Sequence, residues 1–156
     1  MPPEDSGVLV RPAAAQDGQA AARTLLASRR AAEAAGLIPI GTHDDAEVLR
    51  WFTHEVMSTR EVWVAEAGSE VVGVLVLDDA WLDHLYVRPD RARQGIGTLL
   101  LSLATAVRPH GFDLWVFQSN LSAQAFYCRR GLVEVERTNG AGNEEGAPDI
   151  RYRLSR

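Results

Sequence analysis

The sequence has one cysteine, no long apolar run and no excess of basic charge. A single cysteine, Cys128, excludes an intramolecular disulfide framework and a zinc site built from several cysteines. No run of 18 apolar residues is present, so we expect no membrane-spanning segment. The first ten residues lack a basic region followed by a long apolar stretch, so we expect no signal peptide. Together these absences predict a cytoplasmic protein.

The net charge of the chain is −5 at pH 7. An acidic protein repels the phosphate backbone of nucleic acids, so we expect no nucleic-acid partner. One interpretation of this charge is that it attracts a cationic acceptor such as an amine. The other is that mild acidity serves solubility alone.

The 156 residues are 46% hydrophobic and 24% charged, which is typical of a soluble globular protein. A chain of this length fits one domain and is long enough to bury a core. We expect that domain to span residues 1–156, with residues 1–6 frayed.

The residue pattern predicts helices that interleave with the strands of a mixed sheet. Thr42, with Asp45 in the first turn, is the expected N-cap of the second helix. Gly68 and Ser69 form the expected turn of a hairpin within 61–77. Helices are predicted at 16–35, from Thr42 onward, at 96–107 and at 122–130, and the other strands at 7–13, 81–87, 112–118, 132–138 and 149–154. This order indicates an α/β (α+β) fold.

The stretch RARQGIGTLL at 91–100 runs from basic residues through two glycines into an apolar helix. Glycines at a helix start expose backbone N–H groups to an anion, although a lone Gly-x-Gly is also typical of an ordinary turn. A P-loop is excluded because Gly97 is followed by Thr98 and Leu99 rather than by lysine. A dinucleotide fingerprint is excluded because its third glycine falls on Leu100.

A second motif, NLSAQAFYCRRGL at 120–132, follows the glycine segment. With the strand and glycines before it, it resembles the acyl-CoA site of the GCN5-related N-acetyltransferases (GNATs). Asn120, Ala123, the pair Phe126 and Tyr127, and Gly131 stand where that family has its second signature. The resemblance is strongest over residues 61–138, and three positions depart from it. Leu132 replaces a usual phenylalanine, Ala92 replaces an arginine or glutamine, and Arg93 stands where glycine is frequent.

The resemblance implies a mostly antiparallel sheet of about six to seven strands with roughly four helices. Strands 81–87 and 112–118 would splay around acetyl-CoA, and no metal is implied. Backbone groups of Leu85 and Val87 would bind the pantetheine arm, and an N–H near Val87 would polarise the thioester carbonyl. We hypothesise that Arg91 or Arg93 replaces the charge missing at Ala92. The cofactor-binding residues implied are Leu85, Tyr86, Val87, Arg91, Arg93, Gln94, Gly95, Ile96, Gly97, Thr98, Asn120, Ala123 and Phe126.

Tyr127 aligns with the family tyrosine that protonates the departing thiolate; the alternative is that its ring only packs the helix. Asn120 would cap that helix, bind the cofactor arm, or do both. We expect Asp83 to be the base, because strand alternation places it on the same face as Leu85 and places His84 on the opposite face. His84, Glu144, Glu145 and water remain alternatives for the base.

The expected function is transfer of an acetyl group from acetyl-CoA to a primary amine, by direct attack in a ternary complex. The amine belongs to a small molecule or to a peptide or protein. The alternatives are a non-catalytic acyl-CoA sensor, an alcohol acceptor, and a longer acyl chain.

Glu144 and Glu145 either hold a cationic acceptor or lie in a solvated loop. An acetyl-cysteine intermediate on Cys128 is disfavoured, because neighbours on a helix point about 100° apart. A homodimer is left open.

Overall fold

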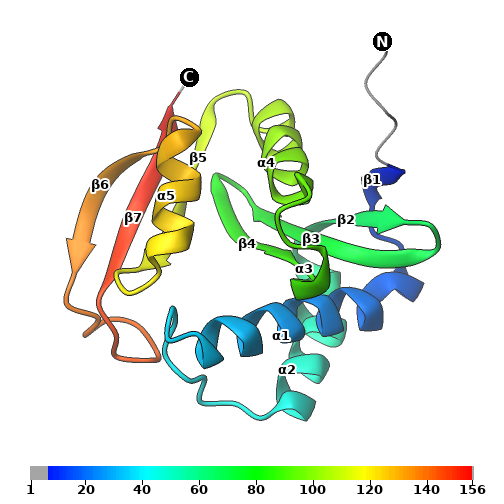
Figure 1. The fold of residues 1–156 in the computed structure, drawn as a ribbon, viewed down its shortest axis with the longest axis horizontal. Coiled ribbons are helices and arrows are strands. Elements are labelled where there is room, and N and C mark those ends of the chain that lie inside the picture. Colours follow the sequence, from blue (N-terminus) through cyan, green and yellow to red (C-terminus); the bar gives the residue numbers. More distant parts are fainter. Residues whose placement is uncertain (1–6, 156) are drawn as a thin grey trace.

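A seven-stranded sheet with the strand order β1-β2-β3-β4-β5-β7-β6 is the frame of the computed structural model, which describes residues 7–155 (Figure 1). The expectation that residues 1–6 are frayed concerns residues outside this described range. The strands are β1 Val8–Pro12, β2 Glu61–Ala67, β3 Glu70–Asp78, β4 Trp81–Val87, β5 Gly111–Phe117, β6 Val133–Thr138 and β7 Asp149–Ser155. In this sheet β4 and β5 are parallel, and the other neighbouring pairs are antiparallel. The mixed, mostly antiparallel sheet expected from the resemblance is confirmed.

Helices cover both faces of the sheet (Figure 1). They are α1 Gly18–Ala34, α2 Asp45–Trp51, α3 Met57–Thr59, α4 Ile96–Val107 and α5 Leu121–Arg129. A π-helical turn, Phe52–Val56, joins α2 to α3. The α1 and α2 helices pack on one face, and α4 and α5 pack on the other. None of the helices found in residues 7–155 has the length and apolar character that crossing a membrane requires.

The strands β4 and β5 meet at one residue pair and then diverge. Trp81 pairs with Asp113, whose N–H donates to the carbonyl of Ala80 at 2.9 Å. At this junction the Asp113 carboxylate accepts hydrogen bonds from Arg151 at 2.6 Å and Arg153 at 2.8 Å, both on β7. The two halves of the sheet are therefore joined at one end and open at the other, as the resemblance implied.

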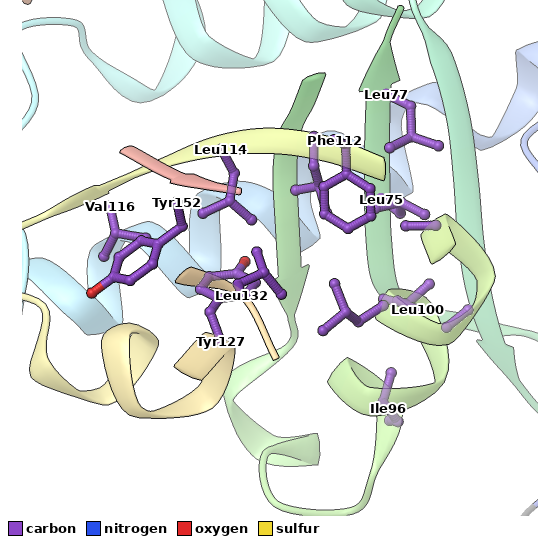
Figure 2. Packing of buried hydrophobic residues seen from close by; sticks show 14 of the residues in the cluster. Leu75, Leu77, Ile96, Leu100, Phe112, Leu114, Val116, Tyr127, Leu132 and Tyr152 are labelled. Atoms are coloured by element: carbon purple, nitrogen blue, oxygen red, sulfur yellow. The ribbon is translucent and has the colours of Figure 1, made fainter. Parts of the chain in front are cut away.

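Packing of side chains holds the two halves together on the α4 and α5 face. Figure 2 shows Leu75 and Leu100 on one side of this core and Leu114, Tyr127 and Leu132 on the other, with Phe112 of β5 between them. Gly73 of β3 brings α4 close, because a Cβ at this position would lie 3.0 Å from the side chain of Leu100. The lack of a side chain at Gly73 therefore allows α4 to pack close to the sheet.

The start of the second helix differs from the sequence prediction. Its N-cap is Asp44, whose carboxylate accepts a hydrogen bond from the N–H of Glu47 at 2.9 Å, and the helix begins at Asp45 rather than near Thr42. A carboxylate caps at least as well as a threonine hydroxyl. The Thr42 hydroxyl instead donates to Glu144 at 2.7 Å, across the molecule.

Candidate active site

A cavity of about 1130 Å³ occupies the opening between β4 and β5. One part, the glycine-loop half, is formed by β4, β5, the segment 91–98 and α5. The other, the α1–α2 half, is formed by the end of α1, the loop 37–43, α2, β4, and Glu144 and Glu145 of the β6–β7 loop. Because both halves meet along β4, two ligands can approach each other there.

The free edge of β4 offers backbone groups to the cavity. Arg88 donates its N–H to the carbonyl of Val72 on β3 at 2.8 Å, and Tyr86 lies opposite Val74. Residues of an antiparallel strand alternate between bonding to the partner and pointing away from it. The N–H and C=O groups of Leu85 and Val87 therefore point toward the open side, where β5 has already diverged.

Asp83 does not lie on the face predicted for it. The pairing of β4 with β3 shifts between Leu82 and His84, so Asp83 is the extra residue of a β-bulge. Leu82 therefore joins the core with Leu85, and Asp83 turns toward Arg60, whose Nε lies 3.2 Å from its carboxylate. The alternation argument was wrong because a bulge reverses the facing of the residues beyond it. Asp83 nevertheless lines the cavity.

The first turn of α4 leaves backbone N–H groups free at the edge of the glycine-loop half. Gly95, the N-cap, is left-handed with φ of 81°, and its carbonyl accepts from the N–H of Leu99. This bond is the first of the helix, so the N–H groups of Ile96, Gly97 and Thr98 have no partner within it. Such groups, at the positive end of a helix, suit an anion.

Arg93 also adopts a left-handed conformation, with φ of 63°. This explains why the corresponding position in the GNAT pattern is often glycine, since a side chain is strained there. Arg91 and Arg93 both line the cavity, which is compatible with either supplying the charge that Ala92 lacks.

Arg130 is a further basic residue at this site, and the sequence reasoning missed it. Its guanidinium donates to the hydroxyl of Thr98 at 2.5 Å and to the carbonyl of Phe126 at 2.9 Å, and it lies 3.8 Å from the centre of the Phe126 ring. Its Nε is buried and has no hydrogen-bond partner within residues 7–155. The run of two arginines before Gly131 was the available signal, but sequence alone does not show that Arg130 reaches the start of α4.

Most residues predicted to bind the cofactor line the cavity. These are Leu85, Tyr86, Val87, Arg91, Arg93, Gly95, Ile96, Gly97, Thr98, Asn120, Ala123 and Phe126. Gln94 is exposed and is not among the lining residues. The Tyr86 side chain faces α1 and α2, so only its backbone is near the glycine-loop half.

The α5 helix presents Asn120 and Tyr127 to the cavity. The Asn120 side chain accepts from the N–H of Ala123 at 3.1 Å, which confirms its predicted capping role. Tyr127 is buried against the core, and this burial raises the pKa of its phenol above the usual 10 (Figure 2). The phenol is therefore protonated at neutral pH and available as a donor.

Aromatic rings line the α1–α2 half. The His84 ring meets Trp51 edge-on at 5.6 Å and stacks with Tyr86 at 6.0 Å. Burial, with the positive charge of Arg29 nearby, lowers the pKa of His84 to about 3, so its imidazole is neutral at pH 7. Burial raises the pKa of Asp83 above its usual value, and the ion pair with Arg60 acts in the opposite direction.

A clasp formed by Thr42, His43 and Glu144 closes the far side of this half. The Glu144 carboxylate accepts from Thr42 and contacts His43, which also contacts Glu47 at 2.9 Å. The loop after α1 thereby reaches the β6–β7 loop, as Figure 1 shows. Sequence alone does not show that His43 meets Glu144, because the two residues lie far apart along the chain.

Comparisons with known proteins identify relatives of this chain. Residues 58–134 match the family model described as the Acetyltransferase (GNAT) domain. A probable N-acetyltransferase of Mycobacterium tuberculosis is 30% identical over 105 residues, which are 61% of this chain and 60% of that protein. The peptidyl-lysine N-acetyltransferase YjaB of Salmonella typhimurium is 33% identical over 78 residues, 49% of this chain and 53% of that protein. The aligned regions thus span only about half to three fifths of these curated relatives.

A solved structure extends the likeness of fold to nearly the whole chain. The PaiA N-acetyltransferase of Thermoplasma acidophilum, in complex with coenzyme A, superimposes with a TM-score of 0.73 at 18% identity. The match covers 96% of this chain and 99% of that one.

We predict that Arg93→Gly raises the free energy of unfolding by about 0.5–1 kcal/mol. Relief of a left-handed side-chain conformation gains about 1–2 kcal/mol, and the greater freedom of glycine in the unfolded chain offsets about half of that. Urea unfolding of the ligand-free protein measures the change. Arg91→Gly, where φ is not left-handed, is the matched control and should lower the stability. A loss in both variants would contradict the strain.

We predict that the His43 pKa lies above its usual 6.5, because hydrogen bonds to Glu47 and Glu144 favour the charged imidazolium. The stabilising contribution of this contact is fully present below pH 6.5 and is lost as the pH rises through the raised pKa. An NMR titration of the imidazole should show that Glu144→Gln moves the pKa down toward 6.5. Glu145→Gln, the neighbouring control, should leave it unchanged. An unchanged pKa in Glu144→Gln would exclude the clasp in solution.

Proposed function

Because this chain belongs to the GNAT superfamily, we propose that it transfers the acetyl group of acetyl-CoA to a primary amine. The amine attacks directly while both substrates are bound. The observation that carries the proposal is the free edge of β4, which adjoins both the anion-binding start of α4 and the aromatic α1–α2 half. That edge provides a place for a thioester between two substrate sites.

The residues of the glycine-loop half fit acetyl-CoA. The free N–H groups of Ile96, Gly97 and Thr98, with Arg91, Arg93 and Arg130 around them, suit a pyrophosphate. The outward N–H and C=O groups of Leu85 and Val87 suit the amides of a pantetheine arm, as in the addition of a strand to a sheet edge. The N–H of Val87, which points toward the open side of β4, can polarise the thioester carbonyl.

In the proposed reaction the amine nitrogen bonds to the thioester carbonyl carbon and the carbon–sulfur bond breaks. Tyr127 supplies a proton to the departing thiolate, since its buried phenol is protonated and lines the cavity. Cys128 is exposed and lies outside the cavity lining, which favours direct attack over an acetyl-cysteine intermediate.

Asp83 is the proposed base, acting on the amine proton through water. It lines the cavity, and its raised pKa makes it a stronger base than an ordinary aspartate. His84 also lines the cavity and is the alternative, but a pKa of about 3 makes its imidazole a weak proton acceptor.

We predict that Tyr127→Phe lowers kcat by about 10²–10⁴-fold, the usual range for loss of a general acid, with little change in acetyl-CoA affinity. Thiol release with a panel of amines measures turnover, and calorimetry measures affinity. Tyr152→Phe, another buried tyrosine but outside the cavity lining, is the control and should keep its activity. Acetyl-CoA binding by the wild type without thiol release for any amine would instead identify a sensor.

We predict that Asp83→Asn lowers kcat at pH 7 and leaves acetyl-CoA affinity intact. In the wild type, kcat should fall as the pH drops through the raised pKa of Asp83, because only the carboxylate accepts a proton; the variant should lack this decline. Asp78→Asn is the control, since Asp78 also pairs with Arg60, at 3.3 Å, but does not line the cavity. A larger loss in His84→Gln than in Asp83→Asn would assign the base to His84.

A further inference from the structure

Arg29 is the cation of the α1–α2 half that has no carboxylate partner in residues 7–155. Arg30, its neighbour on α1, pairs with Glu33 at 2.6 Å and Asp45 at 2.8 Å. His43 contacts Glu47 and Glu144. Among the described residues that line this half of the cavity, Arg29 is therefore the cation without an ion pair, although its charge lies within range of Glu144.

The contacts of Arg29 use little of its hydrogen-bonding capacity. Its Nε donates to the hydroxyl of Tyr86 at 3.3 Å, a long hydrogen bond. The guanidinium carbon lies 5.8 Å from the ring centre of Trp51 and 5.7 Å from that of Tyr86, near the outer limit for a cation–π contact. A guanidinium has five N–H donors, and the two terminal nitrogens of Arg29 have no acceptor in the described part of the chain.

The position of Arg29 matches that of a ligand-binding group. Its side chain lines the cavity from α1, in contact with Tyr86 of β4 and Trp51 of α2. Its positive charge helps to lower the pKa values of both His84 and Glu144, so its field reaches two walls of this half. A planar fork of donors, partly removed from water, binds a carboxylate through two parallel hydrogen bonds.

We propose that the acceptor is an amine that also carries a carboxylate, and that Arg29 binds this carboxylate. This inference rests on the proposed function and narrows its acceptor to an amino-acid-like molecule. The rings of Trp51 and Tyr86 beside the guanidinium, with the His84 ring against both of them, suit an apolar or aromatic body on that molecule. A lysine side chain within a peptide presents an amine with no carboxylate next to it, so it would leave Arg29 unpaired.

Paired acceptors that differ only in their carboxylate test the proposal. Thiol release is measured with phenylalanine and other amino acids, with their carboxamides, and with an amidated lysine peptide. The protein variants are Arg29→Gln, Arg29→Lys and the control Arg23→Gln, which changes an exposed arginine on the same helix. Thermal unfolding of each variant identifies any loss that comes from folding.

We expect the wild type to prefer at least one acid over its amide. Arg29→Gln should lower kcat/KM for that acid by about 10- to 100-fold, chiefly through KM, as expected for loss of hydrogen bonds to a charged group. It should leave the amide unchanged, Arg29→Lys should restore part of the loss, and Arg23→Gln should match the wild type. Amides or the lysine peptide used as well as the acids, or an equal loss for every acceptor in Arg29→Gln, would overturn the proposal.

A separate measurement distinguishes failure of this inference from failure of the proposed function. If no amine causes thiol release, binding of 3-phenylpropanoate and of its amide to the CoA-saturated protein is measured by calorimetry. Binding of the acid alone, lost in Arg29→Gln, supports a carboxylate site at Arg29 even without turnover. Equal binding of both compounds, or of neither, overturns it.

Discussion

The divergence of β4 from β5 after a single residue pair is the constraint on which the cavity depends. Backbone groups that a continuous ladder would satisfy are left at an edge inside the molecule, where each costs about 1–3 kcal/mol if it is buried without a partner. The edge must therefore face water or a ligand that pairs as a strand does. The ion pairs of Asp113 with β7 hold the closed end, and the shared core beneath α4 and α5 limits how far the strands separate.

The two faces of the sheet contribute different chemistry to the one opening. On the α4 and α5 face, helix starts and arginines provide positive charge and backbone donors. On the α1 and α2 face, Arg29 lies beside the rings of Trp51 and Tyr86, which the His84 ring also contacts. The clasp at Glu144 closes the far side. Because β4 is common to both, a group held along its edge is within reach of side chains from each face.

Local signals in the sequence predicted the elements well and the site in part. Glycines at 36 and 131 end helices in left-handed conformations, and the two motifs place the start of α4 and Tyr127 at one cavity. The bulge at Asp83 was missed because register depends on the partner strand. Asp44 was missed as a cap because Thr42 competes with it in sequence. The sequence does not show which of Arg29 and Arg30 forms an ion pair, because Asp45 reaches Arg30 only when α2 packs beside α1.

The position of β7 between β5 and β6 has a consequence for the order of folding. The strands β2, β3 and β4 are connected as successive hairpins, and the short loops between them allow these strands to pair early. By contrast, β5 gains its antiparallel neighbour only after α5, β6 and the following loop have been made. During synthesis on the ribosome, β5 thus has one exposed edge for an extended interval, when it is open to wrong pairing with other chains. Asp113 on that strand, unpaired until Arg151 and Arg153 arrive, carries a charge that opposes such pairing.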